Sequence, residues 1–482
     1  METKKEIIDY LQCIDMSIGF QDLYDNVIGK DACVLCGACI SICPRIGMKS
    51  LKPVLVESDP ECSLCFKYCA RTYFPEEMFE KEIFKSKIPK DYLLGHYQKI
   101  VAARSSNKEI LNVAQNGGIV TNLLIHALNI GLIDGVLLVT KDENWIPKPF
   151  IARTPQDVLS VAGSIYSMAP TLFSYNDAVN KYKLKKLAFV GMPCQIQAAR
   201  KIQLWPPLSE EYGKISLIIG LYCTSNYSYD LMKELVEEKL DIPLKNVEKF
   251  DISKSEFIIH IKEGIIKKVP IQETKRYNWP SCQYCKDYTA EFADISVGSV
   301  GKPAGNWNSV IVRSDVGKEL FNHAIKEKKI TISKDVDITK IKKEALKKKS
   351  KIKELDEKVF SAIRFLNISD KEIKTYAILV SLGYANLQLL SRIMKIDESE
   401  IKINLNLLKE RGWIENERDF YKPTNPTKVI KDEIYKFKRE FQQNIERIKN
   451  EALTDLETLF IQNNLMNVRY KHFMDQIYER VI

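Results

Sequence analysis

The sequence lacks any long apolar run. Nowhere do its 482 residues approach the roughly 20 consecutive apolar positions that a membrane-spanning helix needs. The N-terminal stretch METKKEIIDYLQCIDMS mixes polar and apolar residues and has no apolar signal-peptide core. We therefore expect a cytoplasmic protein with no membrane span.

Cysteine is absent after Cys285, and the 12 cysteines are unevenly spread before it. Seven lie between residues 33 and 69, four lie between residues 194 and 285, and Cys13 stands alone. In a reducing compartment, this many thiols favour metal or redox chemistry over disulfides. Redox chemistry is therefore expected to end before the C-terminal part of the chain, which implies at least three modules. Such a division suits the length, because a single ordinary domain is shorter.

The formal charge of +9 is modest for this length. It does not by itself point to a nucleic-acid partner, because acidic ligands would suit it equally well.

The middle of the chain has an α/β pattern. Short apolar runs at 134–139, 186–191 and 214–222, bounded by glycine or charged residues, are typical of buried strands. Residues 116–131 form a helix pattern between a glycine pair and Gly131. Beyond the lysine-dense stretch 340–354, residues 370–482 predict successive helices with one break of turn and strand character at 412–426.

The first cysteine group begins with the motif Cys33-x2-Cys36-x2-Cys39-x3-Cys43-Pro44. This spacing is typical of thiolates that surround a [4Fe–4S] cluster, with the fourth cysteine serving a second cluster. The alternative, a zinc knuckle, would need CxxC pairs separated by a longer spacer. The motif therefore favours iron–sulfur chemistry.

The second half of this group, Cys62-x2-Cys65-x3-Cys69, lacks its first cysteine, and Asp59 occupies that position. Crossed ligation assigns Cys33, Cys36, Cys39 and Cys69 to one cluster, and Cys43, Cys62 and Cys65 to the other. The fourth ligand of the other cluster is Asp59, which we favour for its spacing, or Cys13. A carboxylate is a harder ligand than a thiolate, so this cluster is expected to be Asp-ligated or convertible to a three-iron form.

Cys194 and Cys223 each follow a predicted strand, and Cys282-x2-Cys285 completes a second set of four. Ligands of open parallel sheets gather at the carboxyl ends of strands, so these thiols can converge. From the spacing alone, isolated buried cysteines remain the alternative for Cys194 and Cys223.

Five stretches around these cysteines carry a family resemblance: NGGIVTNLLIHAL, AGSIYSMAP, GMPCQIQAARK, GLYCTSNY and CQYCKDYTAEFADISVGSVG. From about Tyr97 to Arg313 the chain resembles the beta subunit of coenzyme F420-reducing hydrogenase and its relatives in F420H2 dehydrogenase and formate dehydrogenase. Its N-terminal two-cluster ferredoxin unit is more similar to the electron-input subunit of the F420H2 dehydrogenases.

The resemblance implies an FAD site and a [4Fe–4S] cluster held by Cys194, Cys223, Cys282 and Cys285, which makes about three clusters in all. It also implies that certain residues of this chain bind the flavin, as the matching residues of the family do. The alternative is that these residues only form turns or cap helices. These are Gly117, Gly118, Thr121, Tyr166, Ser167, Pro170, Asp287, Asp294, Ser296, Gly298 and Ser299.

The activity implied is that of an F420-dependent oxidoreductase or electron-transfer subunit. It would move a hydride between coenzyme F420, its substrate, and FAD, and single electrons through the clusters to or from a redox partner protein or larger complex. This chemistry belongs to the cofactors, so no catalytic side chain is predicted. A basic rim for F420 is expected from Arg104, Lys148, Lys302 and Arg313.

The C-terminal region resembles a winged helix of archaeal transcriptional regulators, with a turn at Gly383 and a wing in 412–426. Ile401, Leu405 and Leu408 share one face of its third helix, which leaves Lys402, Asn404, Asn406 and Lys409 for the face that a DNA reader would use. Protein docking is the favoured alternative, with DNA binding second. The last helices, 427–482, are interpreted as an arm for packing or for homo-oligomer formation.

The predicted fold class is an α/β flavin-binding core, an N-terminal bacterial-ferredoxin-like α+β domain, and an all-α/winged-helix C-terminal region. The alternative function is a redox-sensing winged-helix DNA-binding regulator that uses the same flavin and clusters. The expected segments are a ferredoxin-like domain at 1–90, an FAD- and F420-binding core at 91–335, a basic linker at 336–369, a winged-helix-like domain at 370–426 and a helical arm at 427–482.

Overall fold

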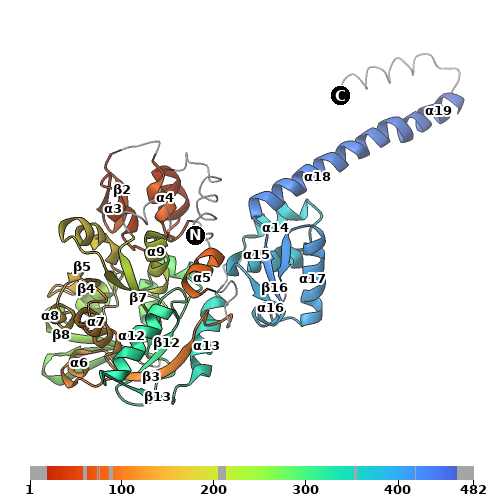
Figure 1. Cartoon of the computed structure of the whole chain (residues 1–482). Helices are drawn as coiled ribbons and strands as arrows, with labels where there is room; N and C mark the ends of the chain where they lie inside the picture. The colour runs from red at the N-terminus through yellow and green to blue at the C-terminus, as the bar shows by residue number, and fades with distance from the viewer. Residues whose placement is uncertain are drawn as a thin grey trace. The chain divides into compact units, whose positions relative to one another are not determined.

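The computed structural model describes residues 19–57, 62–72, 74, 76–85, 91–204, 213–253, 255–351, 355–417 and 419–463. The chain divides into two compact units, Met1–Lys353 and Glu354–Ile482 (Figure 1). Within the described ranges, no helix has the length and the apolar character needed to cross a membrane.

The first unit is built on an eight-stranded mixed sheet with strand order β13-β3-β12-β11-β7-β6-β4-β5. Its four central strands β11, β7, β6 and β4 are parallel, and the flanking strands are antiparallel. The strand bounds are β3 (Lys99–Ser105), β4 (Gly135–Lys141), β5 (Pro147–Ala152), β6 (Leu187–Gly191), β7 (Ile215–Leu221), β11 (Ile295–Gly298), β12 (Asn308–Val312) and β13 (Ile330–Ser333).

The strands predicted at 134–139, 186–191 and 214–222 are confirmed as β4, β6 and β7, which are neighbours in this sheet. Because strand residues alternate between faces, each strand contributes to two cores. Leu137 and Phe189 pack on the face that carries α9 (Pro193–Leu204). Val136 and Ala188 pack on the opposite face, which α7 (Ile119–Asn129) and α12 (Asp315–Lys326) cover.

A second, three-stranded antiparallel sheet has the order β10-β9-β8. Its strands are β8 (Val247–Ser253), β9 (Glu256–Ile261) and β10 (Ile265–Pro270). Phe250 and Phe257 stack within its core, which also includes side chains of η4 (Leu231–Lys239).

The N-terminal cysteine segment has a small core of its own, formed by Leu23, Val27, Ile28 and Ile46 together with Cys39, Cys43 and Cys65. Its elements are α2 (Phe20–Leu23), η1 (Tyr24–Ile28), α3 (Ala38–Ile42), the hairpin β1 (Ile46–Lys49) and β2 (Lys52–Leu55), α4 (Leu64–Tyr68) and α5 (Glu76–Phe84). Val34, Cys36, Tyr68 and Phe79 belong to the same buried cluster as Phe189 of the large sheet. The segment is therefore packed onto the core as part of one unit.

The predicted basic linker, 336–369, differs from the structure. Residues Ile338–Lys349 form helix α13, whose Ile341 and Ala345 are buried against Leu94 and Tyr288 of the first unit. The physical reason is the helical spacing of Ile341, Ala345 and Lys348, which places all three on one face despite the surrounding lysines. The other predicted boundaries stay predictions.

The second unit consists of helices and a three-stranded antiparallel sheet with order β14-β16-β15. Its elements are α14 (Glu357–Arg364), α15 (Asp370–Leu382), β14 (Ala385–Asn386), α16 (Leu387–Met394), α17 (Glu398–Glu410), β15 (Ile414–Glu417), β16 (Phe420–Pro423), α18 (Pro426–Arg447), η9 (Ile448–Leu453) and α19 (Thr454–Asn463). A hairpin of β15 and β16 therefore lies where the sequence predicts a wing.

A buried ion pair joins α9 to the residue that precedes β11. The Nη2 atom of Arg200 lies 2.9 Å from Oδ1 of Asp294, and both side chains are at most 4% exposed. Asp294 also accepts hydrogen bonds from Ile218 N and from the Ser314 hydroxyl. Removing one partner of a buried pair leaves an uncompensated charge, which costs about 3–5 kcal/mol.

We therefore expect Arg200→Met to lower the free energy of unfolding by about 3–5 kcal/mol in denaturant titration. Lys239→Gln serves as the control, because it breaks the Lys239–Glu273 pair, whose side chains are 56% and 40% exposed. Exposed pairs contribute only about 0–1 kcal/mol. Equal losses in the two variants would contradict a stabilising role for the buried pair.

Candidate functional site

The loop that carries the first cysteines turns sharply between Cys33 and α3. Leu35 and Gly37 have φ values of 45° and 83°, and Gly37 caps α3. A Cβ atom at Gly37 would lie 2.7 Å from the backbone nitrogen of Phe173, so only glycine fits against the core at this point.

The structure brings the thiols of Cys33, Cys36, Cys39 and Cys69 together. Burial is the main factor that raises the pKa of Cys39, and the nearby Cys36, Cys69 and Cys33 add to it. Burial and then Cys69 raise the pKa of Cys33 to about 11. Four largely buried thiols that raise one another's pKa are difficult to ionise without a bound cation.

Cys65 lies near Cys69 of the first set and also near two further thiols, those of Cys43 and Cys62. Burial raises the pKa of Cys65 to about 12, with smaller upward contributions from Cys43, Cys62 and Cys69. Cys43, Cys62 and Cys65 therefore lie together. Asp59 and Cys13, the two candidates for a fourth ligand, lie outside the described residues.

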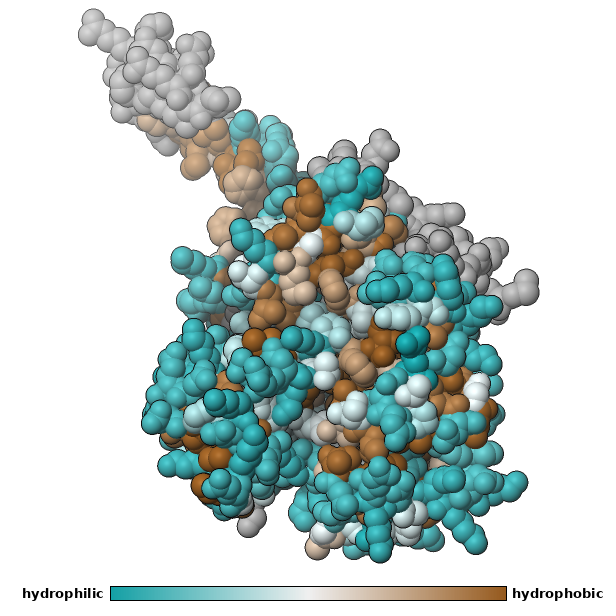
Figure 2. Space-filling view, turned by 90° about the vertical axis from the view of Figure 1, so that its left-hand side faces the viewer, coloured by the Kyte–Doolittle hydropathy of each residue, from teal (hydrophilic) through white to brown (hydrophobic). Residues whose placement is uncertain are grey.

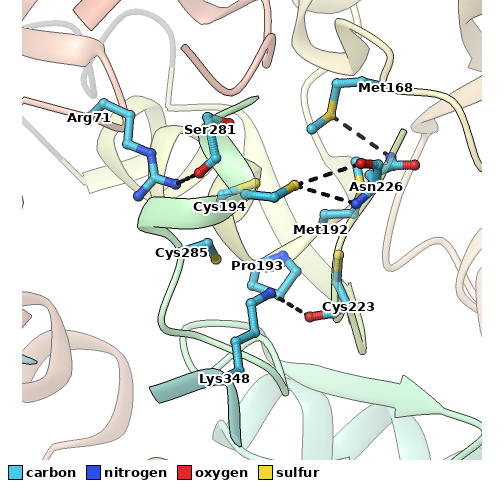
Figure 3. A pocket seen from close by; sticks show the side chains of 11 residues that line it. Arg71, Met168, Met192, Pro193, Cys194, Cys223, Asn226, Ser281, Cys285 and Lys348 are labelled. Atoms are coloured by element: carbon cyan, nitrogen blue, oxygen red, sulfur yellow. Dashed lines mark hydrogen bonds between the residues drawn. The ribbon is translucent and has the colours of Figure 1, made fainter. Parts of the chain in front are cut away.

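The second group of thiols lines a cavity at the carboxyl ends of the central strands. Cys194 lies in the first turn of α9, directly after β6, and Cys223 follows β7. Cys282 lies in η8 (Pro280–Tyr284), and Cys285 follows it. All four line one small cavity, and Figure 3 shows Cys194, Cys223 and Cys285 around it. The four thiols therefore converge at the carboxyl ends of the strands, as their positions in the sequence allow.

Within this cavity the thiols are electrostatically linked. A hydrogen bond between the side chains of Cys194 and Cys285 raises the pKa of Cys194 and lowers that of Cys285. Burial raises the pKa of Cys223 to about 12, and Cys282 and Cys285 contribute further. The backbone N–H of Asn226 donates a hydrogen bond to the Cys282 sulfur at 3.4 Å.

Two cations line the same cavity, and sequence reasoning did not find them as site residues. The Arg71 guanidinium donates to the Ser281 carbonyl at 3.2 Å, and the Lys348 ammonium donates to the Cys223 carbonyl (Figure 3). Burial alone would lower the pKa of Lys348, but Cys285, Cys223 and Cys194 outweigh it, so the net shift is upward. The helical spacing of Ile341, Ala345 and Lys348 is the signal that could have identified this lysine as buried.

A third buried cation, Lys201 of α9, holds the first thiol group to the core. Its ammonium donates to the carbonyls of Cys69 and Lys67 at 2.7 and 3.1 Å, and to the Thr72 hydroxyl at 3.1 Å. Burial lowers the pKa of Lys201 to about 7, although Cys69 and Cys36 act in the opposite direction. A further link is Trp279, whose indole nitrogen donates to the Cys33 carbonyl at 2.7 Å.

In the described part of the chain, no group of three or more His, Cys, Asp or Glu has an arrangement suited to one metal ion. The donors that do come together are sulfur atoms in sets of three and four. Thiolate sets of this kind are the ligands of iron–sulfur clusters, which spread their ligands over several irons.

The predicted flavin glycines lie at the start of α7. Gly118 caps this helix with a φ of 68°. A Cβ atom on Gly117 would lie 2.8 Å from the backbone nitrogen of Asn308 and 2.9 Å from the Ala103 carbonyl. The Asn308 side chain donates to the Gly298 carbonyl at 3.3 Å, so the structure brings Gly298 close to this glycine pair. Thr121 is buried one turn into α7.

Tyr166, Ser167 and Pro170 have surroundings that differ from those of the glycine pair. Tyr166 packs edge-on against Phe257 of the second sheet. The Ser167 hydroxyl is buried and, in the part of the chain that the structure describes, has no hydrogen-bond partner. Pro170 lies against the first thiol segment, because a Cβ atom on Gly37 would lie 3.0 Å from its carbonyl oxygen.

The acidic and hydroxyl positions of the last predicted stretch have different surroundings. Asp287 is buried beside the second thiol group, and burial and then Cys285 raise its pKa. Asp294 and Ser296 already have internal partners, which are Arg200 for Asp294 and the Ala290 carbonyl and Arg313 for Ser296. Ser299 is exposed. All these flavin assignments stay predictions.

One residue of the predicted basic rim is placed elsewhere. Arg313 is fully buried and donates to the carbonyls of Leu94 and His96 at 2.7 and 2.8 Å, so it is not on a rim. Its role is to satisfy backbone oxygens inside the first unit. Arg104 lies over the Trp307 ring, Lys148 pairs with Asp142, and Lys302 donates to the Gly305 carbonyl.

In the second unit, Ile401, Leu405 and Leu408 are buried on one face of α17, as predicted. Asn404 was expected on the outward face, and this prediction is wrong because the residue is only 5% exposed. Lys402, Asn406 and Lys409 are exposed. Their face also carries Ile403 and Leu407, which are 61% and 40% exposed.

Comparison with known proteins identifies three matching families. Residues 100–174 match the family that describes the N-terminal part of the coenzyme F420 hydrogenase/dehydrogenase beta subunit, and residues 184–338 match the family that describes its C terminus. Residues 363–427 match the family described as sugar-specific transcriptional regulator TrmB.

Relatives and a solved structure agree with the first two matches. The coenzyme F420 hydrogenase subunit beta of Methanosarcina barkeri is 39% identical over 237 residues, which is 49% of this chain and 81% of the relative. The F subunit of the F(420)H(2) dehydrogenase of Methanosarcina mazei is 31% identical over 314 residues, 62% of this chain and 83% of the relative. A chain of the F420-reducing [NiFe] hydrogenase complex from Methanosarcina barkeri, solved as a xenon derivative, has a TM-score of 0.52 at 36% identity, covering 54% of this chain and 91% of that one.

Proposed function

The chain belongs to the family of coenzyme F420 hydrogenase/dehydrogenase beta subunits, and we propose that it is the subunit of an F420-dependent oxidoreductase that exchanges a hydride with F420 and single electrons with a partner protein. The observation that carries this proposal is the convergence of Cys194, Cys223, Cys282 and Cys285 on one cavity, next to the first thiol group.

The cofactors of the proposal are FAD and about three iron–sulfur clusters. FAD would supply the conversion between two-electron hydride chemistry and the one-electron chemistry of the clusters. Cys33, Cys36, Cys39 and Cys69 would hold one cluster, and Cys194, Cys223, Cys282 and Cys285 another. Cys43, Cys62 and Cys65 would hold the third with Asp59 or Cys13. The FAD would be held by the flavin-binding stretches 117–121, 166–170 and 287–299, where Ser167 and Asp287 each have a buried oxygen without a hydrogen-bond partner among the described residues.

The side chains around the thiols supply positioning and charge. Lys201 and Trp279 hold the carbonyls of Cys69 and Cys33, so the first thiol group is fixed to the same unit as the second. Arg71 and Lys348 place positive charge at the second group. Positive charge offsets the repulsion among neighbouring thiolates and favours their binding of iron.

The test is anaerobic purification with iron and flavin quantitation, followed by an assay of F420H2 oxidation coupled to viologen reduction. We expect one FAD, about three clusters' worth of iron, and turnover that Cys194→Ser abolishes because a cluster ligand is lost. The control is Thr224→Ala, an exposed position one residue from Cys223, which is expected to keep full turnover. Bound zinc without flavin, or full turnover in Cys194→Ser, would overturn the proposal.

A redox-sensing DNA-binding regulator is the second candidate, and the match of residues 363–427 to a transcriptional-regulator family favours it. In this case the second unit is a winged helix whose α17 presents Lys402 and Lys409 to the DNA backbone.

This candidate predicts a gel shift of duplex DNA that weakens as salt rises, since phosphate contacts release counterions. Lys402→Glu combined with Lys409→Glu is expected to abolish the shift. Lys436→Glu combined with Lys438→Glu, on the exposed face of α18, is the matched control. A shift that persists in the α17 double variant would rule out α17 as the DNA-reading helix.

The arm of α18, η9 and α19 supports homo-oligomer formation. Its apolar residues recur at steps of three and four from Ile434 through Phe441 and Ile448 to Leu456. Phe441, Ile448 and Leu456 are 57%, 61% and 62% exposed, and apolar side chains gather on the arm next to its grey end in Figure 2. A second copy of the chain would cover this stripe.

Charge favours an antiparallel arrangement of the two arms. Residues 426–449 carry seven basic and four acidic side chains, whereas 450–463 carry three acidic and no basic ones. Antiparallel pairing places the basic half of one arm beside the acidic half of the other, which lowers the electrostatic energy of the pair.

We expect the purified chain to have the mass of a dimer in light scattering and Ile448→Lys to have the mass of a monomer, because the new charge would be buried in the stripe. The control Gln443→Lys adds the same charge at an exposed position outside the stripe and is expected to stay dimeric. A monomeric wild type, or a dimeric Ile448→Lys, would contradict arm pairing.

A further inference from the structure

Arg71 contacts both groups of thiols. It lies two residues after Cys69, and its backbone nitrogen is 3.4 Å from the Cys69 sulfur as a donor. Its side chain extends to the other group, where Nη2 donates to the carbonyl of Ser281, the residue before Cys282, at 3.2 Å. Figure 3 shows the guanidinium next to Ser281 at the wall of the cavity. The segment Cys69–Ala70–Arg71 therefore spans from one thiol group to the other.

The charge of Arg71 has no acidic partner among the described residues. Within the described ranges, its side chain makes one hydrogen bond, to Ser281, and its buried Nε atom has no hydrogen-bond partner. The guanidinium stays protonated in proteins. The Arg71 guanidinium lies at the wall of the cavity that Cys194, Cys223, Cys282 and Cys285 line, and the Arg71 backbone nitrogen contacts the Cys69 sulfur. An arginine in this position therefore stabilises negative charge at both groups.

Lys348 provides an internal comparison, because among the described residues its ammonium lies at the second group and has no hydrogen bond to the first. Its ammonium donates to the Cys223 carbonyl and lines the same cavity. The two cations differ in reach, since Arg71 belongs to the N-terminal segment and Lys348 to α13.

We propose that Arg71 is a positioning residue that couples the two thiol groups: it holds the Ser281–Cys282 segment beside Cys69 and, through its fixed charge, favours the reduced state of the clusters at both groups. This inference rests on the proposed function, because it assigns clusters to Cys33, Cys36, Cys39 and Cys69 and to Cys194, Cys223, Cys282 and Cys285. Adding an electron makes a cluster more negative, so a nearby fixed cation raises its reduction potential.

The test is a redox titration, followed by electron paramagnetic resonance, of the anaerobically purified full chain. We expect Arg71→Gln to lower the midpoint potentials of two clusters. The expected shift is about 59 mV for each cluster, which is a tenfold change in the equilibrium constant of a one-electron reduction. Lys348→Gln is expected to lower the potential of one of these two clusters and to leave the other unchanged. Arg71→Lys retains the charge and is expected to restore most of both shifts.

The outcomes separate this inference from the proposed function. A wild-type chain without iron would remove the proposed function and this inference with it. Full iron content with unchanged potentials in Arg71→Gln, or with only one shifted potential, would overturn the coupling role alone. Loss of iron from Arg71→Gln but not from Arg71→Lys would show that the charge is needed to hold the clusters, and equal loss from both would overturn the charge argument.

Discussion

Helix α9 is the constraint on which the arrangement of the first unit depends. Its first turn carries Cys194, and two consecutive basic residues at its other end are fully buried and point in different directions. Arg200 pairs with Asp294 of the large sheet, while Lys201 donates to backbone oxygens of the N-terminal cysteine segment. Burying two cations is costly unless each is bonded, so the sheet and the cysteine segment must both be in place around this helix.

This constraint determines where the thiols lie. Since α9 begins directly after β6, Cys194 is held at the carboxyl end of a central parallel strand, where Cys223 also arrives after β7. Lys201 and Trp279 fix the Cys69 and Cys33 carbonyls to the same body. The two thiol groups thus belong to the same compact unit and are joined by these buried hydrogen bonds.

Local patterns in the sequence were enough to predict the central strands and the spacing of the N-terminal thiols, whereas the grouping of Cys194 and Cys223 with Cys282 and Cys285 came from the family resemblance. The strands have apolar runs with glycine or charged boundaries, and the cysteines have cluster spacing, so each signal is contained within a short window. The buried cations were not predictable in this way. Arg200, Lys201 and Arg313 look like surface residues by composition, and only the tertiary contacts show that each satisfies carbonyl or carboxylate oxygens in the interior. Asn404, and the expected basic linker that contains Lys348, were misjudged for a related reason, because a polar residue inside a charged or amphipathic helix can still fall on the buried face.

The exposed face of α17 bears on what the second unit binds. A helix that enters the major groove benefits from cations and from polar side chains that reach base edges. Here Lys402, Asn406 and Lys409 share the exposed surface with Ile403 and Leu407, and the first turn of the helix holds Glu398 and Glu400. Acidic residues at a helix N-terminus repel phosphate, and exposed aliphatic side chains gain nothing from a phosphate backbone. A mixed apolar and charged face of this kind is better matched by a protein surface, which fits a subunit that passes electrons to a partner.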